Sequence, residues 1–254
     1  MAGNTQINTT RHSRFWEIDL LRTVAVAMML TFHVLYLLNF FDIHNTGVYH
    51  GFWWWFARVC AGTFIFLAGV ALTITYARSN RMSGFTLRGL RIFGWGMVIT
   101  LITLLISRTE YVRFGILHFF GIAFILAPFF LRFRFINLIV GIALLAAGIY
   151  LWGTPQNFPW LLWLMPYSLA TWDYFPLLPW FGLLLVGMFC GKILYPQGNR
   201  RFNIHEFNDP VTSALTLPGR HPLVIYLAQW PAIIGILLVL FPGNVLPYFP
   251  PFPF

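Results

Sequence analysis

Long apolar runs separated by short polar breaks are the feature that most restricts how this chain can fold. A helix that crosses a bilayer needs about 20 apolar residues, and seven runs close to this length follow one another in the sequence. They cover residues 17–40, 52–77, 88–107, 114–131, 135–152, 175–195 and 221–241. The breaks hold turn-forming residues such as Asn45, Gly47, Pro196 and Gly198. The pattern predicts an all-α, polytopic integral membrane bundle of about seven transmembrane helices.

The scarcity of charge also indicates a membrane protein. Only 9% of the 254 residues are charged and 59% are hydrophobic, whereas a soluble domain has about 25% charged residues to cover its surface. The length leaves room for the helices and little else, so we expect one domain over residues 1–254. A polar segment, residues 1–15, precedes the first helix. We expect the tail, residues 242–254, which is rich in proline and aromatic residues, to lie irregularly along the interface.

The net charge of +9 is better explained by membrane orientation than by nucleic-acid binding, because the basic residues are scattered through short connections. Alternate connections hold Arg11 and Arg14; Arg78, Arg81 and Arg88; Arg132 and Arg134; and Lys192, Arg200, Arg201 and Arg220. The opposite connections hold only Arg108 and Arg113. This bias predicts a cytoplasmic N-terminus and, after seven spans, a C-terminus outside. We expect the plasma membrane as the location.

Residues 155–174 do not fit a span. They are rich in Trp, and Pro155, Pro159 and Pro166 divide them into pieces that are too short to cross a bilayer. They fit a re-entrant or interfacial segment outside the seven helices.

Polar groups on the first predicted helix are candidate site residues, because an ionisable side chain inside a span is costly unless it faces a cavity or a partner. Asp19 and Arg22 are three residues apart, so they share a helix face and can pair. His33 lies on that same face about 16 Å further along. The alternative is that the pair sits at the interface and that His33 hydrogen-bonds a neighbouring helix.

Three further candidates are predicted near the outer side, together with His33. His44 lies in the first outer loop with His50, and imidazole is the side chain that titrates near neutral pH. His118 is placed just inside the outer end of the fourth span, and Asp173 at the outer start of the sixth. The alternatives are a solvated loop histidine, a core histidine bonded across helices, and an N-cap of the sixth helix.

Basic residues at the predicted inner rim form a last group. Arg88 and Arg91 open the third span, and Arg220 and His221 open the seventh. A basic inner rim is ordinary in membrane proteins, but converging guanidiniums also suit a phosphate-bearing ligand that arrives from the cytoplasm. No Walker A loop, dinucleotide glycine fingerprint, Cys-x-x-Cys or His-Glu-x-x-His motif occurs. We expect no metal.

Short motifs spread over nearly the whole chain resemble a known family. They are EIDLLR at 17–22, the Arg22-x10-His33 spacing, FGILH at 114–118, DYFPLLPW at 173–180 and GRHPLVIY at 219–226. Together they resemble the DUF1624 family. That family is similar to the catalytic membrane domain of heparan-alpha-glucosaminide N-acetyltransferase and, more distantly, to the membrane acyltransferases that O-acylate surface sugars.

The resemblance nominates two different histidines. The sugar O-acyltransferases use the Arg and His of the first-helix spacing, which carries over to Arg22 and His33. The glucosaminide enzyme has its active histidine in the loop after the first helix, and an ungapped count places His44 there. Either histidine would deprotonate the acceptor or briefly carry the acyl group. Asp19 or Asp173 would orient it or balance its charge.

The resemblance implies transfer of an acyl group, most simply acetyl, from cytoplasmic acyl-CoA to an amine or hydroxyl of a sugar or similar acceptor outside. Arg22, Arg88, Arg91, Arg220 and His221 would bind the phosphates of acetyl-CoA. A proton-coupled transporter or channel is the alternative, since it also needs intramembrane ionisable groups. The partners would be the lipid bilayer and these two substrates, and flat apolar faces are compatible with a homodimer.

Overall fold

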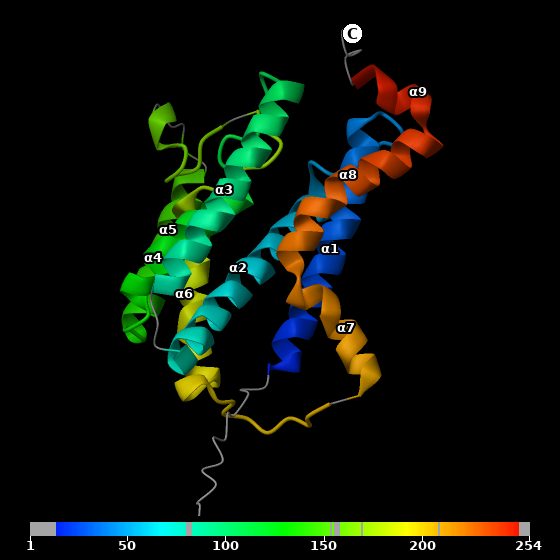
Figure 1. Ribbon diagram of the computed structural model, residues 1–254. Helices are drawn as coiled ribbons and strands as arrows, with labels where there is room; N and C mark the ends of the chain where they lie inside the picture. Colours follow the sequence, from blue (N-terminus) through cyan, green and yellow to red (C-terminus); the bar gives the residue numbers. More distant parts are fainter. Residues whose placement is uncertain are drawn as a thin grey trace, which may run out of the picture.

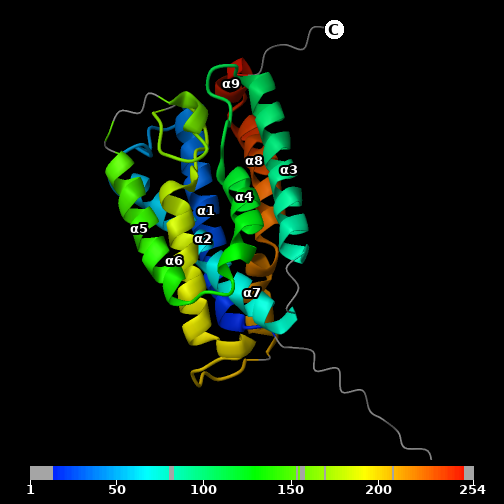
Figure 2. The ribbon, with the colours of Figure 1, turned by 90° about the vertical axis from the view of Figure 1, so that its left-hand side faces the viewer.

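The chain folds into a bundle of long helices, seen from two sides in Figures 1 and 2. The computed structural model describes residues 14–79, 83–152, 154, 158–168, 170–207 and 209–248. The α-helices are α1 (Trp16–Phe40), α2 (Gly51–Ser79), α3 (Ser83–Ile106), α4 (Ile116–Phe130), α5 (Phe135–Trp152), α6 (Leu177–Leu194), α7 (Pro210–Arg220), α8 (Pro222–Leu240) and α9 (Pro242–Val245). The only pairing of β type within these ranges is an isolated bridge between Phe114 and Tyr174. The predicted all-α class is confirmed.

In the described ranges, six helices are long and apolar enough to cross a membrane, namely α1, α2, α3, α5, α6 and α8. The sequence predicts about seven, and the difference is α4, which has only 15 residues. Such a helix is about 22 Å long, shorter than the roughly 30 Å of hydrocarbon in a bilayer. Figure 2 shows α4 beginning well below the upper end of α3. We call the end of the bundle where α1 begins the inner end and the opposite end the outer end.

Close helix packing at glycines holds the bundle together. α2 packs against α6, α6 against α5, and α3 against α4. At the α2–α6 contact the backbone at Gly187 lies against the carbonyl oxygen of Phe66, and Gly69 lies against the backbone of Leu184. Small residues allow two helices to approach this closely, which is the usual way for membrane helices to gain packing contacts.

A separate group of helices forms around α1, which packs against α2, α7 and α8. Figure 1 shows α1 and α8 side by side with α7 beneath them. The sequence did not predict α7, because its 11 residues are amphipathic and too short for a span. Its C-terminal Gly219 donates its N–H to Thr23 Oγ1 over 2.9 Å and lies against the backbone of Asp19. This contact places Arg220 and the start of α8 beside the inner half of α1.

The sequence predicts an irregular tail after α8, but part of this segment is folded. Pro242–Val245 forms α9 and Leu246–Tyr248 forms a 3-10 turn. Asn244 Nδ2 donates to the carbonyl oxygen of Asp42 over 3.3 Å, and the Tyr248 hydroxyl donates to Asp42 Oδ2 over 2.8 Å. The segment therefore caps the α1–α2 connection at the outer end. The rest of the tail and residues 1–13 lie outside the described residues.

The glycine contact between α2 and α6 can be tested by adding one methyl group. We expect Gly187→Ala to destabilise the protein by about 1–3 kcal/mol, because the new Cβ would collide with the Phe66 carbonyl of a packed helix. Gly94→Ala in α3 is the matched control, since nothing lies within 4 Å of its added Cβ. The measurement is the thermal unfolding midpoint in detergent. Equal midpoints for the two variants would contradict the packing described.

Candidate active site

The N-terminus of α4 lies within the bundle and is held by two side chains that the sequence nominated. Gly115 N donates to His118 Nδ1 over 3.2 Å, and Ile116 N donates to Asp173 Oδ2 over 2.8 Å. The other ring nitrogen of His118 lies 3.3 Å from the hydroxyl of Thr100 on α3. His118 is 2% exposed. Both of its nitrogens therefore have partners, which fits the core-histidine alternative better than a catalytic role.

Asp173 caps α4 and not the sixth span, whose start it precedes in sequence. The same Oδ2 oxygen accepts a longer hydrogen bond, 3.4 Å, from the hydroxyl of Tyr226 on α8. Burial raises the pKa of Asp173 to about 6, and the donors Ile116 N and Tyr226 OH oppose this rise. Asp173 thus joins α4 to α8 and carries a carboxyl that titrates close to neutral pH.

The chain segments that carry these groups pair with each other through their backbones. Phe175 N donates to Phe114 O over 2.9 Å, and Trp172 N to Glu110 O over 3.1 Å. Thr103 Oγ1 accepts from Val112 N over 3.1 Å. Non-helical backbone is tolerated at membrane depth only when its polar groups are paired in this way. The described part of 155–174 is thus compatible with the predicted re-entrant or interfacial segment.

His33 lies on α1 among aromatic side chains of α8. Its ring centroid is 6.4 Å from that of Tyr226 and 5.6 Å from that of Trp230. The amide of Gln229 lies beside it, and Gln229 is 3% exposed. In the described part of the chain, His33 Nδ1 and both amide atoms of Gln229 are buried without a hydrogen-bond partner. Each such group costs about 1–3 kcal/mol, so the fold retains three polar atoms at a cost to stability.

Tyr226 connects His33 with Asp173, and the start of α4 connects Asp173 with His118. Tyr226 and Gln229 complete this group. They were not predicted, because the candidates in the spans were chosen for a charge or an imidazole, and these two side chains have neither. Gln229 is the only amide side chain in the apolar stretch of α8, and that is the signal by which it could have been found.

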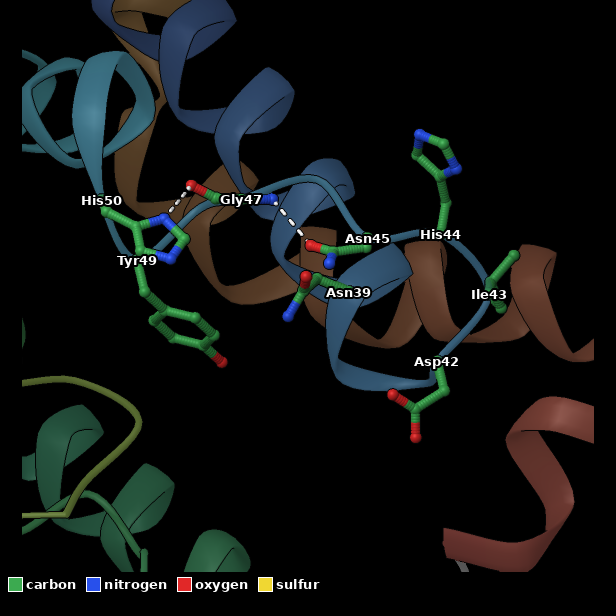
Figure 3. Close-up of a pocket in the computed structure, with 8 residues that line it drawn as sticks. All are labelled: Asn39, Asp42, Ile43, His44, Asn45, Gly47, Tyr49 and His50. Carbon is green, nitrogen blue, oxygen red and sulfur yellow. Dashed lines mark hydrogen bonds between the residues drawn. The ribbon is translucent and has the colours of Figure 1, made fainter.

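His44 lies apart from this group, in the exposed loop after α1 (Figure 3). The loop surrounds an open pocket of about 500 Å³ whose lining includes Asp42, His44, Tyr49 and His50. In Figure 3 the His44 ring points away from the Asp42 carboxylate, and His50 Nδ1 lies 3.3 Å from the carbonyl oxygen of Gly47.

Aromatic contacts connect this outer pocket with His33. The ring of Tyr49 is 6.0 Å from that of Tyr36, and Tyr36 is 6.0 Å from Trp230, which contacts His33. These rings come from α1, α8 and the loop between α1 and α2. The outer pocket and the buried group around His33 are thus joined by one row of amphipathic side chains.

The predicted pair Asp19–Arg22 is present at the inner end and is part of a larger cationic cluster. Asp19 Oδ1 is 3.6 Å from Arg22 Nη1, and Asp19 Oδ2 is 3.7 Å from Arg220 Nε. Arg88 and Arg14 lie close enough for their charges to repel that of Arg22. The side chains of Arg22 and Arg220 are 24% and 30% exposed, so an ion can reach them. Asp19 interacts with Arg22, Arg14 and Arg220, and Glu17 is the second carboxylate nearby. With Arg88, four guanidiniums stand against two carboxylates, which leaves an excess of positive charge.

The structure does not bring every predicted cation into this cluster. Arg91 and His221 are exposed, and neither has a side-chain contact with the cluster in the ranges that the structure describes. A second inner ion pair was not predicted: Glu17 accepts from Arg200 Nε and Nη2 over 2.8 and 2.7 Å and from the Tyr195 hydroxyl over 2.9 Å. This ion pair joins the start of α1 to the segment after α6. Glu17 and Arg200 are 183 residues apart in the sequence, so their spacing gives no sign that they meet.

Residues 14–231 match the model of one protein family, which is described as heparan-alpha-glucosaminide N-acetyltransferase, catalytic. No curated protein and no solved structure matches the chain. Among the described residues, no group of three or more His, Cys, Asp or Glu side chains is placed to hold a metal ion.

The titration of Asp173 gives a prediction about stability and pH. Because burial raises its pKa above the usual 3.8 to about 6, folding favours the protonated carboxyl, and this contribution is lost as pH rises from 4 to 6. Asp173→Asn has no carboxyl that titrates at this position, so only the wild type should lose this stability. We expect the unfolding midpoint of the variant to rise relative to that of the wild type between pH 4 and 6, and the difference to stay constant above pH 6. A difference that does not change between pH 4 and 7 would contradict the raised pKa.

Proposed function

The chain belongs to the heparan-alpha-glucosaminide N-acetyltransferase catalytic family, and from this premise we propose that it transfers an acyl group, most simply acetyl, across the membrane. The donor is acetyl-CoA on the cytoplasmic side. The acceptor is an amine or hydroxyl of a sugar or a similar molecule at the outer side of the plasma membrane. The family supports a membrane acyltransferase, and the donor, acceptor and direction are our proposal.

The position of His33 is the observation that supports this proposal best. It is half-buried on α1, about 16 Å from Arg22 along the helix, and a row of aromatic rings leads from it to the outer pocket. The nucleotide phosphates of acetyl-CoA would bind the arginine cluster, and the pantetheine arm would carry the thioester to His33. Bidentate guanidinium groups suit phosphate oxygens in charge and in geometry.

The reaction then takes place at His33, between the arginine cluster at the inner end and the pocket at the outer end. His33 takes the proton from the acceptor amine or hydroxyl, and the freed nucleophile attacks the thioester carbon. The C–S bond breaks and the proton passes to the sulfur, which leaves as the thiol of CoA. Asp173 positions Tyr226, whose ring lies against the imidazole.

Histidine substitutions distinguish the two nominated bases. We expect His33→Ala to lower the transfer rate by about 10²- to 10⁴-fold, since the general base is lost. His44→Ala should keep most of the rate, as should the control His50→Ala in the same exposed loop. The measurement is acetyl transfer by protein reconstituted in liposomes with acetyl-CoA on one side. Loss of the rate in His44→Ala alone would assign the base to the loop, and full activity in both would defeat the proposal.

The arginine cluster can be tested through donor binding. We expect Arg88→Gln to weaken acetyl-CoA binding roughly 10-fold or more, because one charged hydrogen bond to phosphate contributes about 1.5–3 kcal/mol. Arg91→Gln is the matched control, because Arg91 lies one turn further along α3 outside the cluster. The readout is the rise of the unfolding midpoint with acetyl-CoA concentration. No rise in the wild type at millimolar acetyl-CoA would contradict the proposal and favour a transporter.

A further inference from the structure

Gln229 is the most deeply buried polar side chain near His33, and the imidazole of His33 is the one polar group recorded beside it. It lies on α8 with Tyr226 and Trp230, which are three residues before it and one after it, and both of these rings contact His33. Its amide nitrogen and oxygen are unpaired among the described residues, and so is His33 Nδ1. An apolar residue of similar size would fill the position without this cost.

Three neighbouring unpaired atoms of this kind indicate a polar ligand. They offer two amide N–H donors, one carbonyl acceptor and one imidazole nitrogen, all without a charge. Among the described residues, no charged side chain is recorded as acting on His33, whose one polar neighbour is Gln229. A neutral group with an oxygen acceptor, such as a thioester carbonyl, therefore fits the position beside His33 better than a phosphate or a carboxylate.

We propose that the side-chain amide of Gln229 binds the carbonyl oxygen of the acyl group during transfer. This inference rests on the proposed function. As the acceptor nitrogen or oxygen bonds to the carbonyl carbon, negative charge develops on the carbonyl oxygen, and the Gln229 N–H groups stabilise it. The charge returns as the C–S bond breaks, and the proton that His33 received goes to the sulfur. A donor preorganised in a site that excludes water contributes most at this stage.

The test replaces the amide and measures stability and turnover in the same protein. We expect Gln229→Leu to unfold at the same temperature as the wild type or at a higher one, because the unpaired amide is removed. We expect its kcat to fall by about 10²- to 10³-fold, the usual loss when one such donor is removed. The KM for acetyl-CoA should change little, since the arginine cluster holds the nucleotide. Ala228→Leu, at the adjacent exposed position of α8, is the matched control and should leave all three values unchanged.

A spectroscopic measurement reports the hydrogen bond itself. With carbonyl-labelled acetyl-CoA bound and no acceptor present, the carbonyl stretch should lie at lower frequency in the wild type than in Gln229→Leu. A structural role of Gln229 would not move this band. Gln229→Met, which keeps the length of the side chain but has no donor, serves if the leucine variant is not obtained, and the same shift is expected.

The possible results separate this inference from the proposed function. A wild-type kcat in Gln229→Leu overturns the inference, as does an unchanged kcat with a raised KM for the acceptor, which would assign the amide to the acceptor. A leucine variant that is less stable than the wild type also overturns it, because the amide would then support the fold. If the wild type itself shows neither stabilisation by acetyl-CoA nor transfer, the proposed function has failed.

Discussion

The N-terminus of α4 has polar backbone groups that must be paired where water is scarce, and much of the site depends on how they are paired. A helix of 15 residues that starts within the bundle exposes its first N–H groups to the interior. His118 and Asp173 accept two of them. Asp173 comes from another part of the chain, so capping α4 also places a carboxylate within reach of α8 and its Tyr226.

The reaction centre that we propose lies between two surfaces of opposite character. At the inner end, arginines of α1 and of the end of α7 lie beside Asp19, and an arginine of α3 adds to their positive charge. At the outer end, the connection after α1 forms an open pocket. Between them, α1 and α8 hold an imidazole, an amide and several aromatic rings. A transferase that takes its donor and its acceptor from opposite sides needs this order, because neither substrate then has to cross the bilayer. The four groups His33, Tyr226, Gln229 and Asp173 come from three separate stretches of the chain.

Much of the fold and part of the site could be predicted from the sequence. The apolar runs indicated the long helices, because the thickness of a bilayer sets a minimum length that few other constraints impose. The pair of Asp19 and Arg22 was predicted because two residues three apart on a helix are neighbours in any fold. α4 was predicted too long, because hydropathy does not show where a helix starts when the adjoining loop is also apolar. α7 was not predicted, because it is short and amphipathic.

The sequence by itself determined the membrane class, the approximate spans, the family motifs and the short-range pair on α1, since each depends on composition or on residues close together in the chain. Only the tertiary structure decided that Asp173 caps α4, that Gln229 lies beside His33 and that Arg220 reaches Asp19. The same packing left His44 in an exposed loop, away from His33. The physical reason is that contacts between helices depend on which faces meet at the close approaches of small residues, such as Gly219 against the backbone of Asp19. The packing of the whole bundle determines which helix faces meet. The spacing of residues along one helix does not predict it.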